Sequence, residues 1–297
     1  MSEDKFLEEL KHRVSEKLGN GVHIKSQRVR KNNNVVYLGL ILHREGCNIA
    51  PTLYVNSLYE EYQKGADLEE LAEHVVQSYH QGAVKTDISM DFFMDFEKVK
   101  ERIAYRLINA EMNKELLKDI PHILFLDWAI CFYYAFHHDT IGEGMILIHN
   151  SHMDMWKTNH EELMKLAVEN TKRMFPPMLM SLGELLKDMW LEPTASNLYV
   201  LSNEQKCHGS IALLYPGMLQ EAAELLGGDF FVLPSSIHEV LLLRRQKEDD
   251  TDVLLDMISE ANRNHVMEEE LLSYHLYYYD TEQDKLLKVE RNNENYG

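Results

Sequence analysis

The residues best placed to do chemistry lie in the segment "FFVLPSSIHEVLLLRR", residues 230–245. Two apolar runs flank a short polar stretch that contains Ser235, Ser236, His238 and Glu239. Hydroxyls and free backbone N–H groups in a tight turn can hold an anion or fix a loop. The same side chains can instead bond to neighbouring backbone and simply connect two strands. A binding loop and a structural turn therefore both stay open.

Alternation in the flanking runs predicts how this segment is held. Phe231, Leu233, Val240 and Leu242 are expected to be buried on two neighbouring strands. His238 is then expected at or near the surface of the turn between them. Rigid strands on both sides would fix the polar side chains in place, which a binding site requires.

A second group of candidates is His149, His152 and Asp154 in "HNSHMDMW". A spacing of three suits the start of a helix, and imidazole and carboxylate groups together are ligands for transition metals. The alternative interpretation is that these residues are exposed or cap a short helix, with Asn150 and Ser151 as the N-cap.

The sequence lacks the common catalytic motifs. It contains no G-x-x-x-x-G-K-[ST] loop, no G-x-G-x-x-G and no G-x-S-x-G. His238 and Glu239 are not followed by a second His at helical spacing, and zinc needs three or four converging ligands. No cofactor and no resident metal are therefore expected, and no residue is assigned a catalytic role.

Charge and cysteine content narrow the class of protein. The 297 residues carry a formal net charge of −19, and 45% are apolar. An acidic chain is not expected to bind nucleic acid or an anionic membrane, whereas a protein partner stays open. Three widely spaced cysteines suit reduced thiols, and no signal peptide or membrane-spanning run is found. We expect a soluble cytoplasmic protein of unknown partners.

The elements that position these residues can be predicted from periodicity. Helices are predicted at residues 1–19, 67–79, 113–119, 158–170, 182–190, 216–226 and 250–261. Strands are predicted as a hairpin with a third strand at 22–55, at the end of 92–107, and at 123–136, 144–150, 197–202, 210–215, 230–234, 239–245 and 271–280. Thr158 with Glu161 predicts a capping box at the fourth helix. Because helices and strands do not alternate strictly, the pattern indicates an α+β fold with a mixed, mainly antiparallel sheet and packed helices.

Two adjacent prolines mark the best candidate boundary. Pro176 and Pro177 are expected to stop a helix and to separate subregions at 1–175 and 178–291. The region around them has few of the Gly and Ser residues of a flexible linker, so the subregions are expected to share an interface. The polar tail, residues 292–297, is expected to be disordered.

Several segments together resemble a bacterial family, domain of unknown function 5688, which is common in gut Firmicutes. The matching stretches are "NIAPTLYVNSLYEEYQKG", "NKELLKDIPHILFLDWAICFYY", "HNSHMDMWKTNHEELMKLAVENT", "FVLPSSIHEVLLL" and "LLSYHLYYYD". The resemblance implies a single module in a bacterial cytoplasm, and it implies no activity.

Three hypotheses for function follow. The first is a non-enzymatic binding or regulatory module, because no assembled catalytic motif is present. The second is a metal-dependent hydrolase that uses His238 and Glu239, with His152 and Asp154 as optional further ligands. The third is a component of a mobile-element or phage-conflict system, in keeping with the family that the chain resembles.

Overall fold

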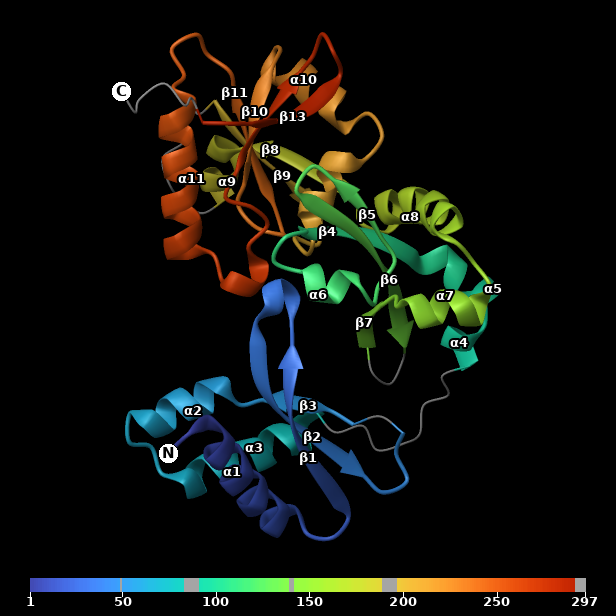
Figure 1. Cartoon of the computed structure of the whole chain (residues 1–297), viewed down its shortest axis with the longest axis vertical. Coiled ribbons are helices and arrows are strands. Elements are labelled where there is room, and N and C mark those ends of the chain that lie inside the picture. Colours follow the sequence, from blue (N-terminus) through green and yellow to red (C-terminus); the bar gives the residue numbers. More distant parts are fainter. Residues whose placement is uncertain (49, 83–90, 139–141, 189–196, 292–297) are drawn as a thin grey trace. The chain divides into compact units, whose positions relative to one another are not determined.

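Figure 1 shows the chain as a computed structural model, and the fold is α+β with three mainly antiparallel sheets, as the sequence predicts. The structure describes residues 1–48, 50–82, 91–138, 142–188 and 197–291. The chain divides into two compact units. Unit 1 comprises Met1–Phe92 with His137–Glu143, and unit 2 comprises Phe93–Phe136 with Gly144–Gly297.

Unit 1 is a three-stranded sheet with helices on one face. Its elements are α1 (Glu3–Leu18), β1 (Val22–Arg30), the 3-10 turn η1 (Asn32–Asn34), β2 (Val36–Arg44), β3 (Thr52–Tyr54), α2 (Asn56–Gln63) and α3 (Leu68–Gly82). The strand order is β1-β2-β3. The predicted hairpin is confirmed, and Asn33 and Asn34 make its turn with φ of 57° and 64°. Asn tolerates this left-handed conformation better than most residues, which explains the triple Asn signal.

The core of unit 1 follows the predicted helical periodicity. Phe6, Leu10 and Val14 of α1 are fully buried, and they pack with Leu38 and Leu40 of β2. Helices α2 and α3 add Leu58, Leu68, Leu71, Ala72, Val75 and Tyr79 to the same cluster. All three helices therefore cover the same face of the sheet.

The first part of unit 2 holds a second antiparallel sheet, in the order β4-β6-β5 with β7 also on β6. The elements are α4 (Asp91–Met94), α5 (Phe96–Val99), η2 (Lys100–Arg102), β4 (Ile103–Asn109), α6 (Lys114–Leu117), β5 (His122–Phe125), β6 (Trp128–His138), β7 (Gly142–Leu147), α7 (Asn150–Trp156) and α8 (His160–Met174). The prediction of one continuous strand at 123–136 is wrong, because a turn at Leu126 and Asp127 splits it. Leu126 has a φ of 55°. Gly and Asn favour this conformation, and because neither stands at this turn, the sequence pattern does not predict it.

The starts of α7 and α8 differ by one residue from the prediction. The N-cap of α8 is Asn159, whose Oδ1 accepts the Glu162 N–H at 3.0 Å, while Thr158 bonds to the Glu162 carboxylate. The predicted Thr158–Glu161 box is therefore wrong in register. Helix α7 begins at Asn150 with His149 as its N-cap, where the sequence predicts Asn150 or Ser151.

The rest of unit 2 is a six-stranded sheet in the order β13-β12-β10-β11-β9-β8. Its elements are β8 (Pro177–Ser181), α9 (Leu182–Asp188), β9 (Leu198–Asn203), η3 (Gly209–Leu214), α10 (Met218–Leu226), β10 (Phe230–Pro234), β11 (Val240–Arg244), α11 (Thr251–His265), η4 (Glu268–Glu270), β12 (Leu276–Asp280) and β13 (Lys285–Val289). The strand predicted at 210–215 is wrong, because these residues lie in and just after the 3-10 helix η3. Gly209 to Leu213 are buried throughout, and an apolar run buried on all sides does not distinguish a strand from a helix.

Other features bear on the sequence predictions. Asp250 caps α11 and Gly227 ends α10, as predicted.

Helix α8 ends before Pro176, but the boundary between subregions at Pro176–Pro177 stays a prediction that limited proteolysis would test. None of the three cysteines forms a disulfide. Within the described residues, no helix has the length and apolar character to cross a membrane. The polar tail at 292–297 and the end of the helix predicted at 182–190 lie outside the described residues.

Candidate functional site

The polar segment between β10 and β11 forms a closed turn. The Ser236 Oγ accepts the His238 N–H at 3.0 Å, and the Ser236 N–H donates to the Glu239 carbonyl at 3.1 Å. Ile237 is buried, and its N–H donates to the Glu270 carbonyl at 2.8 Å. These backbone groups are therefore bonded inside the protein, and Ser236 acts as a turn-stabilising residue.

His238 is half-buried in a hydrogen-bonded cluster. Its Nδ1 accepts the backbone N–H of His208 at 3.2 Å, and its Nε2 lies 3.4 Å from a carboxylate oxygen of Glu270. The two imidazoles lie nearly parallel, with ring centroids 5.4 Å apart. The carboxylate partner of His238 is thus Glu270, which is distant in sequence, and not the adjacent Glu239.

His208 extends this cluster inward to Arg106 on β4. The Arg106 Nη1 lies 3.3 Å from His208 Nε2, and because a guanidinium can only donate, Nε2 must be the acceptor. Burial, followed by the charge of Arg106 and the neighbouring His238, lowers the pKa of His208 to about 3. His208 is therefore neutral at physiological pH.

Gly209 allows the loop to approach η3 closely. An added Cβ would lie 2.2 Å from the Ser202 Oγ and 2.6 Å from the His238 carbonyl oxygen. That carbonyl already accepts a hydrogen bond from Ser202 Oγ at 2.8 Å. The sequence prediction missed Arg106, His208 and Gly209, and no local signal links them to the loop at Ser235–Glu239.

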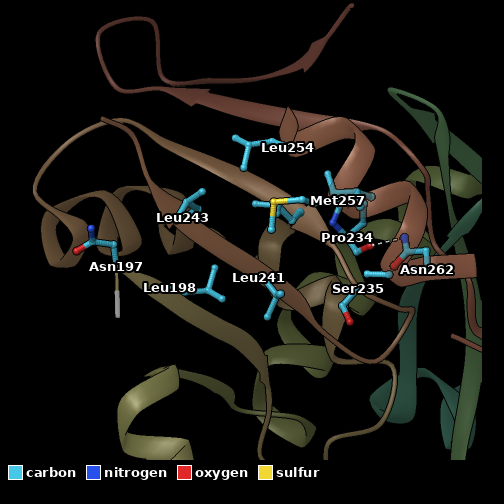
Figure 2. Close-up of a pocket in the computed structure, with 12 residues that line it drawn as sticks. Asn197, Leu198, Pro234, Ser235, Leu241, Leu243, Leu254, Met257 and Asn262 are labelled. Atoms are coloured by element: carbon cyan, nitrogen blue, oxygen red, sulfur yellow. Dashed lines mark hydrogen bonds between the residues drawn. The ribbon is translucent and has the colours of Figure 1, made fainter. Parts of the chain in front are cut away.

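The other side of the same segment opens on an apolar pocket of about 280 Å³. Figure 2 shows this pocket between the six-stranded sheet and α11. Its lining residues are Asn197, Leu198, Leu233, Pro234, Ser235, Leu241, Leu243, Leu254, Met257, Ile258, Ala261 and Asn262. Of the four core positions predicted beside the loop, Phe231, Val240 and Leu242 are buried, whereas Leu233 is only half-buried. Leu233 departs from the expected burial because it lines this pocket.

Polar groups lie at the two ends of the pocket. Figure 2 places Asn197 at one end and Ser235 near Asn262 at the other. The Asn262 side-chain amide donates to the Pro234 carbonyl at 3.0 Å and to the Ser273 carbonyl at 2.8 Å. Asn262 is buried, so it ties α11 firmly to the strand end where the loop begins.

The candidate metal ligands lie at the start of α7. The His149 N–H donates to His152 Nδ1 at 3.0 Å, so the two histidines form a capping arrangement. The His152 ring also packs edge-on against Phe93 at 4.9 Å, and burial lowers its pKa. Asp154 is exposed. Among the residues that the structure describes, no three His, Cys, Asp or Glu side chains form a group able to hold a metal ion.

A further polar cluster, absent from the sequence predictions, surrounds Asp127. Its carboxylate accepts hydrogen bonds from His275 Nδ1 at 2.7 Å, from the Ser273 hydroxyl at 3.1 Å and from the Tyr277 hydroxyl. Burial acts to raise the pKa of Asp127, but the hydrogen bonds from Tyr277, His275 and Ser273 outweigh it and the pKa is lowered. Ser273, His275 and Tyr277 alternate along an extended segment, so their side chains lie on one face. The sequence shows this alternation, but it does not show that Asp127 is the common partner.

Asp127 fixes how His275 can react. A carboxylate can only accept, so Nδ1 is the donor, and in the neutral imidazole Nε2 then carries the lone pair and can accept a proton. The His275 side chain is 46% exposed, and it borders an open cavity of about 510 Å³ between α11 and the end of β13. Ser273 is fully buried and lies on the Nδ1 side, so it is not arranged as the nucleophile of a Ser-His-Asp triad.

The comparisons with known proteins define the family of this chain. Residues 3–281 match the family of unknown function DUF5688. The match covers most of the chain, and the protein belongs to that family. No curated protein and no solved structure matches the chain.

Proposed function

We propose that this protein is a non-enzymatic binding module whose ligand is a small apolar molecule held between the six-stranded sheet and α11. The observation that carries the proposal is the pocket of about 280 Å³ beside the Ser235–Glu239 turn. Most ligand sites are apolar concavities with a few polar groups that orient the ligand. The leucine walls, with Asn197 and Ser235 at opposite ends, have this composition.

The size of the pocket indicates the size of the ligand. An engineered apolar cavity of about 150 Å³ holds one benzene molecule, and drug-sized ligands occupy roughly 300 Å³ or more. A pocket of about 280 Å³ therefore suits a fused aromatic ring system or a short alkyl chain. None of its twelve lining residues has an ionisable side chain, which favours binding over acid–base catalysis.

The contacts around the pocket suggest how binding could be transmitted within unit 2. Asn262 joins α11 to Pro234, and the turn after Pro234 joins Glu270 and His208. A ligand that fixes α11 against the sheet would also stabilise this turn. The proposal places the module in a bacterial cytosol, the setting that the family resemblance implies.

Fluorescence of N-phenyl-1-naphthylamine tests the proposal, because this probe brightens in apolar sites. We expect saturable binding to the full chain. Ala261→Phe should fill the pocket and weaken binding about tenfold or more, whereas Leu225→Ser should leave it unchanged. Leu225 is an exposed residue of α10 that does not line the pocket. Equal binding by both variants would refute this site.

A second candidate function is hydrolysis of small esters, favoured by one observation: the His275 imidazole oriented by Asp127. In this reaction Nε2 accepts a proton from water as the water oxygen bonds to the ester carbonyl carbon. The proton then passes to the departing alkoxide, which gives a carboxylic acid and an alcohol. Tyr274, Ser259 and Arg291 line the same cavity and supply polar groups at its wall.

Hydrolysis of p-nitrophenyl acetate distinguishes this candidate from the first. His275→Gln should abolish any rate above that of buffer, and Asp127→Asn should lower it. His160→Gln, which changes another exposed histidine of unit 2, serves as the control. Equal rates for His275→Gln and His160→Gln would exclude His275 as the base.

A further inference from the structure

The acidic chain contains one segment of opposite charge. Residues 20–44 include five Lys or Arg residues and no Asp or Glu, in a protein whose net charge is −19. This segment is the β1–β2 hairpin of unit 1 (Figure 1). A net charge describes the average field of a protein and hides a local patch of the other sign.

Strand alternation sorts the hairpin residues onto two faces. The face toward α1, α2 and α3 carries the core residues Leu38, Leu40 and Leu42. The opposite face, here called the outer face, carries His23, Lys25, Gln27 and Val29 of β1, Lys31 at the turn, Tyr37, Ile41 and His43 of β2, and Thr52 and Tyr54 of β3. In the described part of unit 1, the helices contribute their buried residues to the core on the first face.

Aromatic and cationic groups meet on the outer face. The rings of Tyr37 and Tyr54 have centroids 5.2 Å apart, and the Lys31 ammonium lies 4.3 Å from the Tyr54 ring centroid. Tyr54 is 41% exposed. Lys25 is exposed and forms no ion pair with any described residue, whereas Arg28 on the other face is paired with Glu3 and Asp4. The outer face thus carries Lys25 and Lys31 beside the half-exposed Tyr37 and the exposed Tyr54, and at its far end the Glu45 carboxylate lies 3.8 Å from His23 Nε2.

We propose that the outer face of unit 1 binds a single strand of nucleic acid. Proteins bind single strands by combining cations that follow the phosphates with aromatic rings on which the bases stack. Lys25 and Lys31 lie six residues apart, about 20 Å along an extended strand, which places two cations along one track. Tyr37 and Tyr54 lie on this track and contact the bases. The net charge of the whole chain predicts no binding to nucleic acid. We propose the opposite for this face, because the net charge averages over the whole chain.

The rings favour nucleic acid over an acidic peptide. An acidic peptide would be attracted by the same lysines, but it would gain little from a tyrosine pair. Every base has a flat face, so stacking is tolerant of sequence, and weak preference among bases is expected. A duplex would present phosphates and not free base faces, so it should bind more weakly than a single strand.

Fluorescence anisotropy of a labelled 12-nucleotide oligo(dT), with the full-length chain in about 50 mM NaCl, tests the proposal. Lys25→Glu should weaken binding about fivefold, and it should reduce the slope of log K against log salt by about 0.7 for each phosphate that the variant no longer neutralises. Tyr54→Leu should weaken binding about tenfold. Lys285→Glu, a charge reversal at an exposed position of β13 in unit 2, is the matched control and should bind like the wild type.

Three results would overturn the proposal. They are an absence of binding at this low salt concentration, an equal loss of affinity for Lys25→Glu and Lys285→Glu, or competition by polyglutamate as effective as by unlabelled oligo(dT). The last result would assign the face to an acidic protein partner. Circular dichroism melts of each variant ensure that weaker binding does not reflect unfolding.

Discussion

The three-stranded sheet of unit 1 and the six-stranded sheet of unit 2 follow the same rule and present different chemistry. Strand alternation gives each sheet two rows of side chains: in unit 1 the helices cover one row, and in unit 2 α11 packs on the row that carries Phe231, Leu233 and Leu243. In unit 1 the row opposite the helices carries Lys25, Lys31 and a tyrosine pair, whereas in unit 2 the leucines beneath α11 line the pocket. The polarity of the side chains on these two faces, not the strand order, is the reason that we propose a different kind of ligand for each unit.

The two units also differ in how their parts are tied together. Unit 1 has one continuous apolar core formed by its helices and strands. In unit 2, polar clusters join distant segments: Asp127 meets His275, and Arg106 meets His208 and through it His238. Buried polar groups are costly when one partner is removed. Substitutions at these clusters should therefore destabilise unit 2 more than surface changes destabilise unit 1.

The largest effect is expected for Gly209→Ala. The added Cβ would lie 2.6 Å from each of two backbone atoms and closer still to Ser202 Oγ, so the loop and η3 must separate. We expect a loss of about 3 kcal/mol in the free energy of unfolding. The matched control is Gly21→Ala in unit 1, where nothing lies within 4 Å of the added Cβ. Urea denaturation that gives equal stabilities for the two variants would contradict the close approach.

Asp127→Asn should have the second largest effect, about 2 kcal/mol, because the carboxylate accepts three hydrogen bonds. The pKa of Asp127 in the folded protein is below its ordinary value of 3.8. Its contribution to stability is therefore complete above that value and is lost as the pH falls through the folded pKa. Denaturation curves measured from about pH 5 downward should show a steeper decline for the wild type than for Asp127→Asn. Parallel declines would mean that the carboxylate gains nothing in the folded state.

A smaller loss, about 1 kcal/mol, is expected for His238→Ala. The substitution removes the acceptor of the His208 N–H and the partner of Glu270, but the side chain is 30% exposed, so water can replace part of both. His160→Ala, at an exposed position, should cost less than about 0.5 kcal/mol. If both variants melt at the same temperature as the wild type, His238 is only a surface residue of the turn. A loss above about 2 kcal/mol would indicate a more deeply buried hydrogen-bonded group.

The sequence is sufficient to predict those elements that depend on a local pattern of residues. The Asn33–Asn34 turn, the Asp250 cap and the Gly227 terminus each depend on the conformational preference of a few adjacent residues. Strands β10 and β11 are predictable because their apolar runs are bounded by Pro234 and polar residues. These features require no knowledge of what the chain packs against.

Features that depend on tertiary contact are not predictable from the sequence. Leu126 adopts a positive φ next to Asp127, which is hydrogen-bonded by Tyr277 of β12, and η3 is helical where it is buried on all sides. Strands β8 and β13 are short edge strands whose sequences lack a strong alternation. The partners of His238 are His208 and Glu270, which are distant in sequence. The sequence alone favours the adjacent Glu239 as the partner of His238, and this choice is misleading.

The smallest effect is expected for Asp154→Asn, which tests the metal hypothesis at α7. His149 and His152 bond to each other across the helix start, and Asp154 is exposed further along the helix. If the histidines only cap the helix, the substitution should change the free energy of unfolding by less than about 0.5 kcal/mol. Elemental analysis of wild type and variant, each dialysed against zinc and then buffer, should give the same metal content. A lower zinc content in the variant would show that the three side chains do converge on an ion, because zinc requires each of its ligands at about 2 Å.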